Sequence, residues 1–99
     1  MLFLRGLLGS FMMINEKLDR IKKALELLRI VAEDAATPRA VKRILKESLE
    51  TLQNEKLSPG VRAANVVSAL EEVVQDPNLP SFSRVQIWSA VSQLEGIRD

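Results

Sequence analysis

Side chains able to do chemistry are few in this 99-residue chain, which contains no His, no Cys and no Tyr. Without His or Cys, no Ser-His-Asp or Cys-His catalytic arrangement can form, nor a zinc site of thiolates and imidazoles. The acidic pairs Glu33–Asp34 and Glu71–Glu72 do not share a site, since neighbouring side chains on a helix point about 100° apart. Nothing places a Lys beside a particular Ser. We therefore expect no enzyme, no cofactor and no metal site.

The charged residues nearly balance, with 14 basic and 13 acidic side chains and a net charge of +1. The first 56 residues hold 11 of the basic and 8 of the acidic side chains. Basic residues on the first two expected helices could contact phosphates, with Lys42 and Arg43 as candidate interaction residues. That set is Arg20, Lys22, Lys23, Arg29, Arg39, Lys42, Arg43 and Lys46. Interleaved acidic residues favour an ordinary solvated surface, so nucleic-acid or ribosome association stays an alternative.

An apolar segment, residues 1–14, precedes the rest of the chain and carries one charge, Arg5. It is shorter than the roughly 20 apolar residues of a membrane-spanning helix, and a signal peptide would have its charge before the apolar run. Three interpretations stay open: an artefact of the assigned start site, with translation beginning at Met12 or Met13; a functional surface anchor; or a loosely packed tail. We expect no membrane span and one domain over residues 15–99.

Apolar residues from Asn15 onward recur at steps of three and four, the period of amphipathic helices. The first stripe consists of Leu18, Ile21, Leu25, Leu28 and Ala32. Thr37–Pro38 and Ser58–Pro59 have the residue types of an N-cap followed by the first helical position, and Gly96 is a natural C-terminal stop. The pattern predicts helices over about 15–34, 38–54, 59–75 and 80–95.

The same pattern predicts the core. We expect burial of seven residues: Leu28, Leu45, Leu49, Leu70, Val73, Val91 and Leu94. The fourth helix should also turn Val85, Ile87 and Trp88 inward, although Trp88 could instead be an exposed interface anchor. The apolar stripe of the first helix is wider than one bundle contact requires, because Ile30 and its neighbours extend it. Such a leftover patch is typical of a surface that binds a protein partner or a second copy of the chain.

The chain repeats itself at an offset of 42 residues. Five positions are identical between the copies, among them Leu28 and Leu70, Asp34 and Asp76, and Pro38 and Pro80. The repeating unit is a helical hairpin. Two units are too few for a solenoid, but they can close face to face. The predicted fold is therefore all-α, a four-helix up-and-down bundle built from two similar helical hairpins.

The repeated turns are candidate structural sites, defined by Asp34, Pro38, Arg62, Asp76, Pro80 and Arg84. An Asp in such a turn can accept hydrogen bonds from the turn's own amides. Its charge is unfavourable at a helix C-terminus, as that of an Arg is at an N-terminus, so we expect ion pairs across the turns. Arg62 is the expected partner of Asp76 or Asp34. A row of arginines that binds an acidic partner is the alternative.

Three segments carry a resemblance: LSPGVRAA at 57–64, DPNLP at 76–80 and RVQIWSAVSQLE at 84–95. Over about residues 15–95 the chain resembles the archaeal uncharacterised protein family 0147, whose members begin near the position of Asn15. The resemblance implies a cytoplasmic four-helix bundle and brings no catalytic or cofactor residues with it. For function, we expect an uncharacterised interaction module, as a homodimer or the subunit of an assembly, with nucleic-acid or ribosome association as the alternative.

Overall fold

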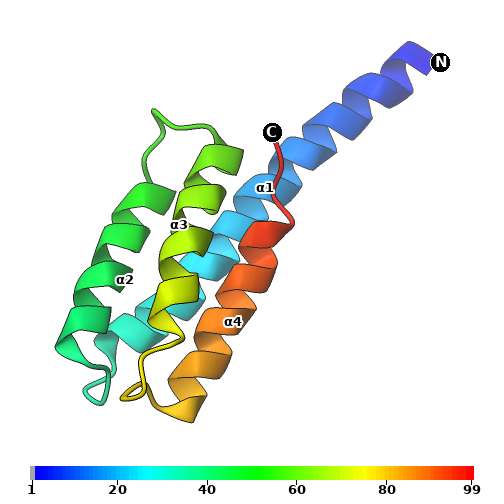
Figure 1. The fold of residues 1–99 in the computed structure, drawn as a ribbon. Coiled ribbons are helices and arrows are strands. Elements are labelled where there is room, and N and C mark those ends of the chain that lie inside the picture. The colour runs from blue at the N-terminus through cyan, green and yellow to red at the C-terminus, as the bar shows by residue number, and fades with distance from the viewer. Residues whose placement is uncertain (1) are drawn as a thin grey trace.

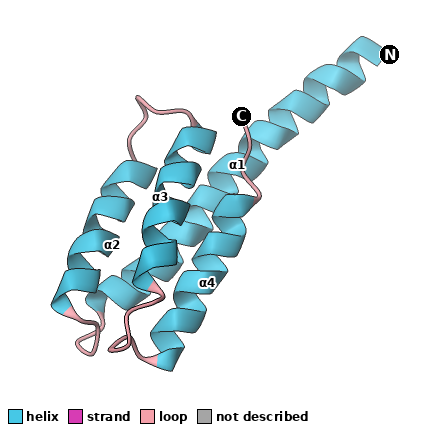
Figure 2. Ribbon diagram, viewed as in Figure 1, coloured by secondary structure: helices cyan, strands magenta, loops and turns pink. Residues whose placement is uncertain are grey.

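The structure, a computed structural model, describes residues 2–99, with side chains described from residue 15 onward. Four helices and no strand make up this part of the chain (Figures 1 and 2). They are α1 (Leu2–Glu33), α2 (Arg39–Leu52), α3 (Pro59–Val73) and α4 (Ser81–Glu95). The prediction of four helices is confirmed, and the boundaries of the last three agree with it to within two residues.

The first helix starts earlier than predicted. Its backbone is helical from Leu2, whereas the sequence pattern placed its start near residue 15. Residues 2–14 contain no Pro, and a Gly such as Gly6 weakens a helix by about 1 kcal/mol without ending it. This end of α1 projects beyond the other three helices (Figure 1). Whether it acts as an anchor or a tail depends on side chains outside those described. No helix in the described part is long and apolar enough to cross a membrane.

The four helices enclose one aliphatic core, and their contacts are consistent with a bundle. Helix α1 packs against α2 and α4, α2 packs against α3, and α3 packs against α4. Six of the seven residues predicted to be buried are buried: Leu28, Leu45, Leu70, Val73, Val91 and Leu94. The prediction is wrong for Leu49, which is half-buried, because the inner face of α2 is centred on Leu45, Ser48 and Leu52.

The inner face of α4 also differs from the prediction. Val85 and Trp88 were expected inside, but they are 60% and 47% exposed. The residues that face the core are Ser83, Ile87, Ala90, Val91 and Leu94. Ile87, Val91 and Leu94 share one side of the helix, whereas Val85 and Trp88 lie on the other, so these five residues cannot all face the core. On α1, Leu18 was likewise placed in the buried stripe and is 50% exposed.

Helix ends follow the predicted residues in two of three cases. Ser58 is the N-cap of α3 and its hydroxyl accepts a hydrogen bond from the Val61 amide at 3.3 Å; Gly96 is the C-cap of α4. The predicted N-cap role of Thr37 is wrong, since Pro38 occupies that position of α2. Thr37 is buried, and its hydroxyl donates to the Val31 carbonyl at 2.6 Å, which satisfies the end of α1 instead.

Candidate interaction surface

The three turns between helices share one hydrogen-bonding pattern. In each turn, a side-chain oxygen accepts a hydrogen bond from the amide two residues further on. The distance is 2.8 Å at Asp34, 3.1 Å at Asn54 and 2.8 Å at Asp76. The carbonyl of the same residue accepts from the amide three residues on. Four residues after it comes the N-cap of the next helix, which is Pro38 or Pro80 in the two repeated turns.

The arginines of the turns bind carbonyls rather than carboxylates. Arg84 donates from Nε to the Val74 carbonyl and from Nη2 to the Asp76 carbonyl, both at 3.0 Å. The buried Arg62 donates from Nε to the Leu57 carbonyl at 2.8 Å. Carbonyls at the end of a helix have no partner within that helix and carry the negative end of its dipole. Arg84 therefore stabilises the C-terminus of α3, although it belongs to the first turn of α4.

The predicted ion pairs across the turns are wrong for the described side chains. Neither Asp34 nor Asp76 forms an ion pair with Arg62, whose Nε donates to the Leu57 carbonyl. The ion pair present among these residues joins Lys23 and Asp19, one turn apart on α1, at 3.1 Å. Both of its side chains are more than half exposed, so its contribution to stability is small.

Because Asp76 accepts a backbone hydrogen bond and forms no ion pair with Arg62, its two obvious variants should differ. Asp76→Asn should leave the free energy of unfolding nearly unchanged, because the amide oxygen can still accept the hydrogen bond from the Asn78 amide. Asp76→Ala removes that acceptor and should cost about 0.5–2 kcal/mol, as for a lost cap. Chemical denaturation of both variants checks the order. Equal losses would show that the charge of Asp76 matters and would contradict the hydrogen-bonding interpretation.

Helix α4 presents an exposed face without charge, which we call the α4 face. It consists of Ser81, Phe82, Val85, Trp88, Ser89 and Ser92, all exposed. Between residues 81 and 94 the single charged side chain is Arg84, which is half-buried against the preceding turn. Phe82 is 60% exposed, so three large apolar side chains stand on this one face. Sequence analysis singled out Trp88 but missed Phe82 and Val85; the signal that could have found them is the charge-free run.

The basic residues predicted on α1 and α2 lie on two helices that pack together. Six of the eight are exposed, and the other two, Arg20 and Lys42, are half-buried. Arg43 is among the exposed ones. The exposed Glu26, Glu47 and Asp19 interrupt the set, as the sequence indicated. The apolar patch expected on α1 is smaller than predicted, because Ile30 is 50% exposed but its neighbour Val31 is buried.

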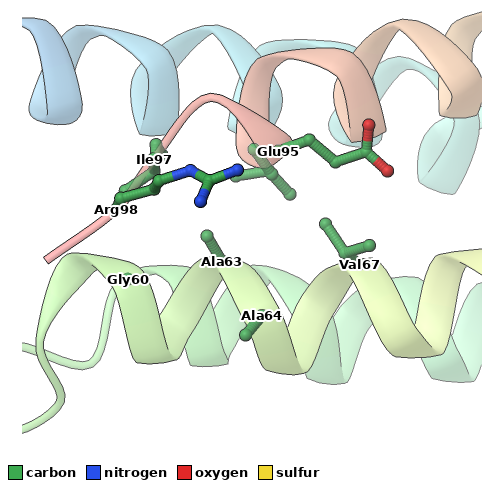
Figure 3. Close-up of a pocket in the computed structure, with 8 residues that line it drawn as sticks. Gly60, Ala63, Ala64, Val67, Glu95, Ile97 and Arg98 are labelled. Carbon is green, nitrogen blue, oxygen red and sulfur yellow. The ribbon is translucent and has the colours of Figure 1, made fainter.

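A small hollow of about 210 Å³ lies between α3 and the end of the chain. On one side it is lined by α3, and on the other by the end of α4 and the residues after it (Figure 3). The lining residues are Gly60, Ala63, Ala64 and Val67 on the first side and Leu94, Glu95, Ile97 and Arg98 on the second. Next to it, the Asp99 carboxylate accepts hydrogen bonds from the Ser58 hydroxyl at 2.5 Å and the Gly60 amide at 2.8 Å. These contacts hold Asp99 against the N-terminus of α3. Sequence analysis did not predict them.

The Asp99 contact should respond to pH. The hydrogen bond from Ser58, and then that from Gly60, hold the pKa of Asp99 below its ordinary value of 3.8. The ionised carboxylate therefore favours the closed end above pH 3.8, and this contribution is lost as the pH falls through the lowered pKa. NMR titration of the carboxyl carbon measures the pKa.

Gly60→Ala is the matched variant for that titration. A Cβ at residue 60 would lie 2.6 Å from the Asp99 Cγ, so the carboxylate must move away. The pKa of Asp99 should then rise toward its ordinary value. An unchanged pKa in Gly60→Ala, or an ordinary pKa in the unaltered protein, would contradict the contact.

Among the described residues, no three acidic side chains gather closely enough to hold a metal ion. Four helices around one aliphatic core, joined by similar turns, define a small all-helical protein. Residues 9–97 match the model of the uncharacterised protein family UPF0147, and the chain belongs to that family. The match starts six residues earlier than the resemblance suggested.

Similar proteins come from archaea. The UPF0147 protein of Metallosphaera sedula is 48% identical over 80 residues, which cover 81% of this chain and 90% of that protein. The UPF0147 protein of Aeropyrum pernix is 45% identical over 80 residues, with 81% and 88% covered. The family assignment therefore rests on similarity over most of both chains.

Two crystal structures have the same fold. One, of a Thermoplasma acidophilum protein from the uncharacterised family UPF0147, has a TM-score of 0.78 and 27% identity, and covers 85% of this chain and 99% of that chain. The other, of the unknown-function protein MMP1188, has a TM-score of 0.76 and 33% identity, with 82% and 92% covered. These names assign no activity, so the function must be argued from the surface of this chain.

Proposed function

We propose that this protein is a non-catalytic interaction module that works as a subunit of a protein assembly and binds its partner through the α4 face. The observation that carries the proposal is the exposure of Phe82, Val85 and Trp88 on a helix face without charge. Exposed aromatic residues at low charge density are typical of the centre of protein interfaces. The non-catalytic part is supported by the composition, which lacks the most common nucleophile–base pairs.

The proposal includes the finer arrangement of the chain. We infer that the four helices run alternately up and down as two hairpins, supported by the short connections and the repeated turns. We also propose a cytoplasmic location, in line with the family resemblance. Spin-label distances between helix ends test the topology: labels at residues 16 and 95 should lie close together, and labels at residues 16 and 82 far apart.

A paired set of variants tests the α4 face in the source organism. A tagged chain is purified from cells together with whatever it binds, with nuclease present, and compared with Val85→Asp and Val61→Asp. Val61 is 42% exposed near the start of α3, so it is a matched control outside the α4 face. We expect a discrete protein, which can be an untagged copy of the chain, to be retained by the tagged chain and by Val61→Asp but lost from Val85→Asp. Equal recovery from all three would contradict the proposal.

Association with nucleic acid is the second candidate, favoured by the exposure of six of the eight basic residues on α1 and α2. If it is correct, changing Lys42 and Arg43 to Gln should weaken binding and reduce the slope of log affinity against log salt by about one unit per lost phosphate contact. Fluorescence anisotropy with single-stranded and double-stranded RNA measures both. Absence of binding by the unaltered protein at low salt would exclude this candidate.

A further inference from the structure

We infer that the first two turns of α2 contact the phosphate backbone of a double-stranded nucleic acid. The inference rests on the second candidate function, since it names the contacting surface and the form of nucleic acid. It starts from a run of positive charge: residues 39–46 contain four basic and no acidic side chains, whereas the whole chain has a net charge of +1. We call these four residues the α2 patch: Arg39, Lys42, Arg43 and Lys46. Three of them are exposed, and Lys42 is half-buried.

Three cations of the α2 patch form one row on the outer side of the helix. Arg39, Arg43 and Lys46 follow one another at steps of four and three residues, the spacing of one helix face. Helix geometry places this row opposite the buried side of α2, which is centred on Leu45. The row extends over about 10.5 Å along the helix axis. An extended partner can therefore reach all three cations at once.

The charges of α2 are arranged against its own stability. A helix dipole favours acidic residues in the first turn and basic residues in the last, and α2 has neither. Arg39 and Arg43 are like charges one turn apart, as are Lys42 and Lys46, and such pairs weaken a helix. Among the described side chains, no carboxylate forms an ion pair with the α2 patch. Folding of the helix therefore does not explain this concentration of positive charge.

The outer row of α1 provides a comparison. It consists of exposed side chains whose charges alternate in sign: Lys22, Glu26, Arg29 and Glu33. Each cation of that row has a carboxylate one helical turn away, so the row as a whole is neutral. The α2 patch lacks such alternation, and for this reason we assign the phosphate contacts to α2 rather than to α1.

The second hairpin provides another comparison. At the offset of 42 residues, the outer row of α2 corresponds to three uncharged residues of α4: Ser81, Val85 and Trp88. Helix α4 therefore forms at the equivalent place without these cations. The architecture of the hairpin does not require the row.

The composition of the α2 patch favours phosphates over other anionic partners. The centre of a protein interface is rich in aromatic residues, and a helix that lies on a membrane buries an apolar side. The outer row of α2 provides neither, since its three members are all cations. Contacts to phosphates need only positive charge and hydrogen-bond donors.

The absence of aromatic residues also selects the duplex. Single-stranded nucleic acids bind by stacking their bases on aromatic side chains beside a basic groove. Helix α2 contains no aromatic residue, and it does not pack against α4, which carries Phe82 and Trp88. In a duplex the bases stack on one another and the phosphates lie outside, so cations alone are sufficient for contact. Duplex RNA and duplex DNA share this backbone.

The number of cations sets the expected strength. Glu47 and Glu50 follow the α2 patch, so contact ends there. The slope of log affinity against log salt is about −0.9 per phosphate contact, so four contacts give a slope of about −3.6 at most. Non-specific binding of this kind typically has a dissociation constant of about 10⁻⁴–10⁻⁶ M at physiological salt, and we expect a value near the weak end, about 10⁻⁴ M.

Fluorescence anisotropy with a short duplex RNA, a duplex DNA and a single-stranded RNA tests the surface. Arg43→Gln should weaken duplex binding about 5–10-fold at about 0.1 M salt and make the salt slope shallower by about 0.9. Arg29→Gln, the same change at an exposed position of α1, should leave both nearly unchanged. Binding of the duplexes supports the inference, and the tighter of the two identifies the source of the phosphates.

The outcomes separate this inference from the candidate function on which it rests. Equal losses in Arg43→Gln and Arg29→Gln, or tighter binding of the single strand, would overturn the α2 patch as a duplex surface and leave nucleic-acid association standing. Absence of binding to all three probes at low salt would overturn both.

Thermal unfolding of Arg39→Glu gives a readout that does not depend on binding. An acidic residue in the first turn complements the helix dipole, so this variant should unfold at a higher temperature while it binds the duplex more weakly. A lower unfolding temperature would show that Arg39 serves the fold, and unchanged binding would show that it does not contact phosphate. Either result would overturn the inference.

Discussion

Leu70→Ala should lower the free energy of unfolding by about 2–5 kcal/mol, through lost transfer free energy and the cavity left behind. Leu70 is fully buried on α3, within the one core that all four helices share. A loss of this size is a large fraction of the roughly 5–15 kcal/mol that stabilises a domain. Urea denaturation followed by far-UV circular dichroism gives the value.

Leu18→Ala is the matched control for this measurement. Leu18 is 50% exposed on α1, so its truncation leaves no closed cavity and should cost less than about 1 kcal/mol. If Leu70→Ala also lost less than about 1 kcal/mol, the buried position of Leu70 on the inner side of α3 would be wrong. If the Leu18 variant lost as much as the Leu70 variant, the exposed position of Leu18 would be wrong.

Arg84→Ala should lower the free energy of unfolding by about 1.5–3 kcal/mol, the range for hydrogen bonds made by a charged group. Its guanidinium donates to two carbonyls that follow α3, those of Val74 and Asp76. Without it, the Val74 carbonyl loses this donor, and the Asp76 carbonyl keeps only the hydrogen bond from the Leu79 amide. Chemical denaturation measures the loss, and faster amide exchange in the last turn of α3 should accompany it.

Three further variants separate the contribution of the Arg84 hydrogen bonds from that of its side-chain packing. Arg84→Met keeps the packing of the side-chain stem and removes the hydrogen bonds, so it should lose nearly as much as Arg84→Ala if the hydrogen bonds dominate. Arg84→Lys should fall in between, because an ammonium cannot reproduce the fork of a guanidinium. Arg39→Ala, at an exposed first position of α2, should lose almost nothing. Full stability of Arg84→Met would show that packing, not carbonyl capping, is the role of Arg84.

The positions of the helices could be predicted because they depend on local patterns. Apolar residues at steps of three and four, together with Ser58–Pro59 and Gly96, placed α2, α3 and α4 to within two residues. The 42-residue repeat also pointed to equivalent turns, and Asp34 and Asp76 do accept the same hydrogen bond. The start of α1 was missed because a change in composition near residue 15 does not require a break in the backbone.

The partners of charged side chains could not be predicted in the same way. A rule based on opposite charge paired Arg62 with Asp76 or Asp34, yet the guanidinium binds the nearby carbonyl of Leu57. Carbonyl groups belong to every residue, so a sequence gives no sign of which ones lack a partner. The contact of Asp99 with Ser58 and Gly60 was missed for a related reason, since it joins residues 39 or more positions apart.

The sequence alone predicted the four helices, their turns and most of the aliphatic core. Each of these depends on residues that lie a few positions apart. The tertiary structure was needed to show which side of α4 faces inward. Hydrophobicity favoured burial of Val85 and Trp88, but the small side chains of Ser83 and Ala90 pack against the core instead. Helix α4 carries large apolar residues on two sides and can turn only one of them inward, so its hydrophobicity pattern alone did not decide between them. The exposed α4 face, and every proposal about its partner, follows from that packing.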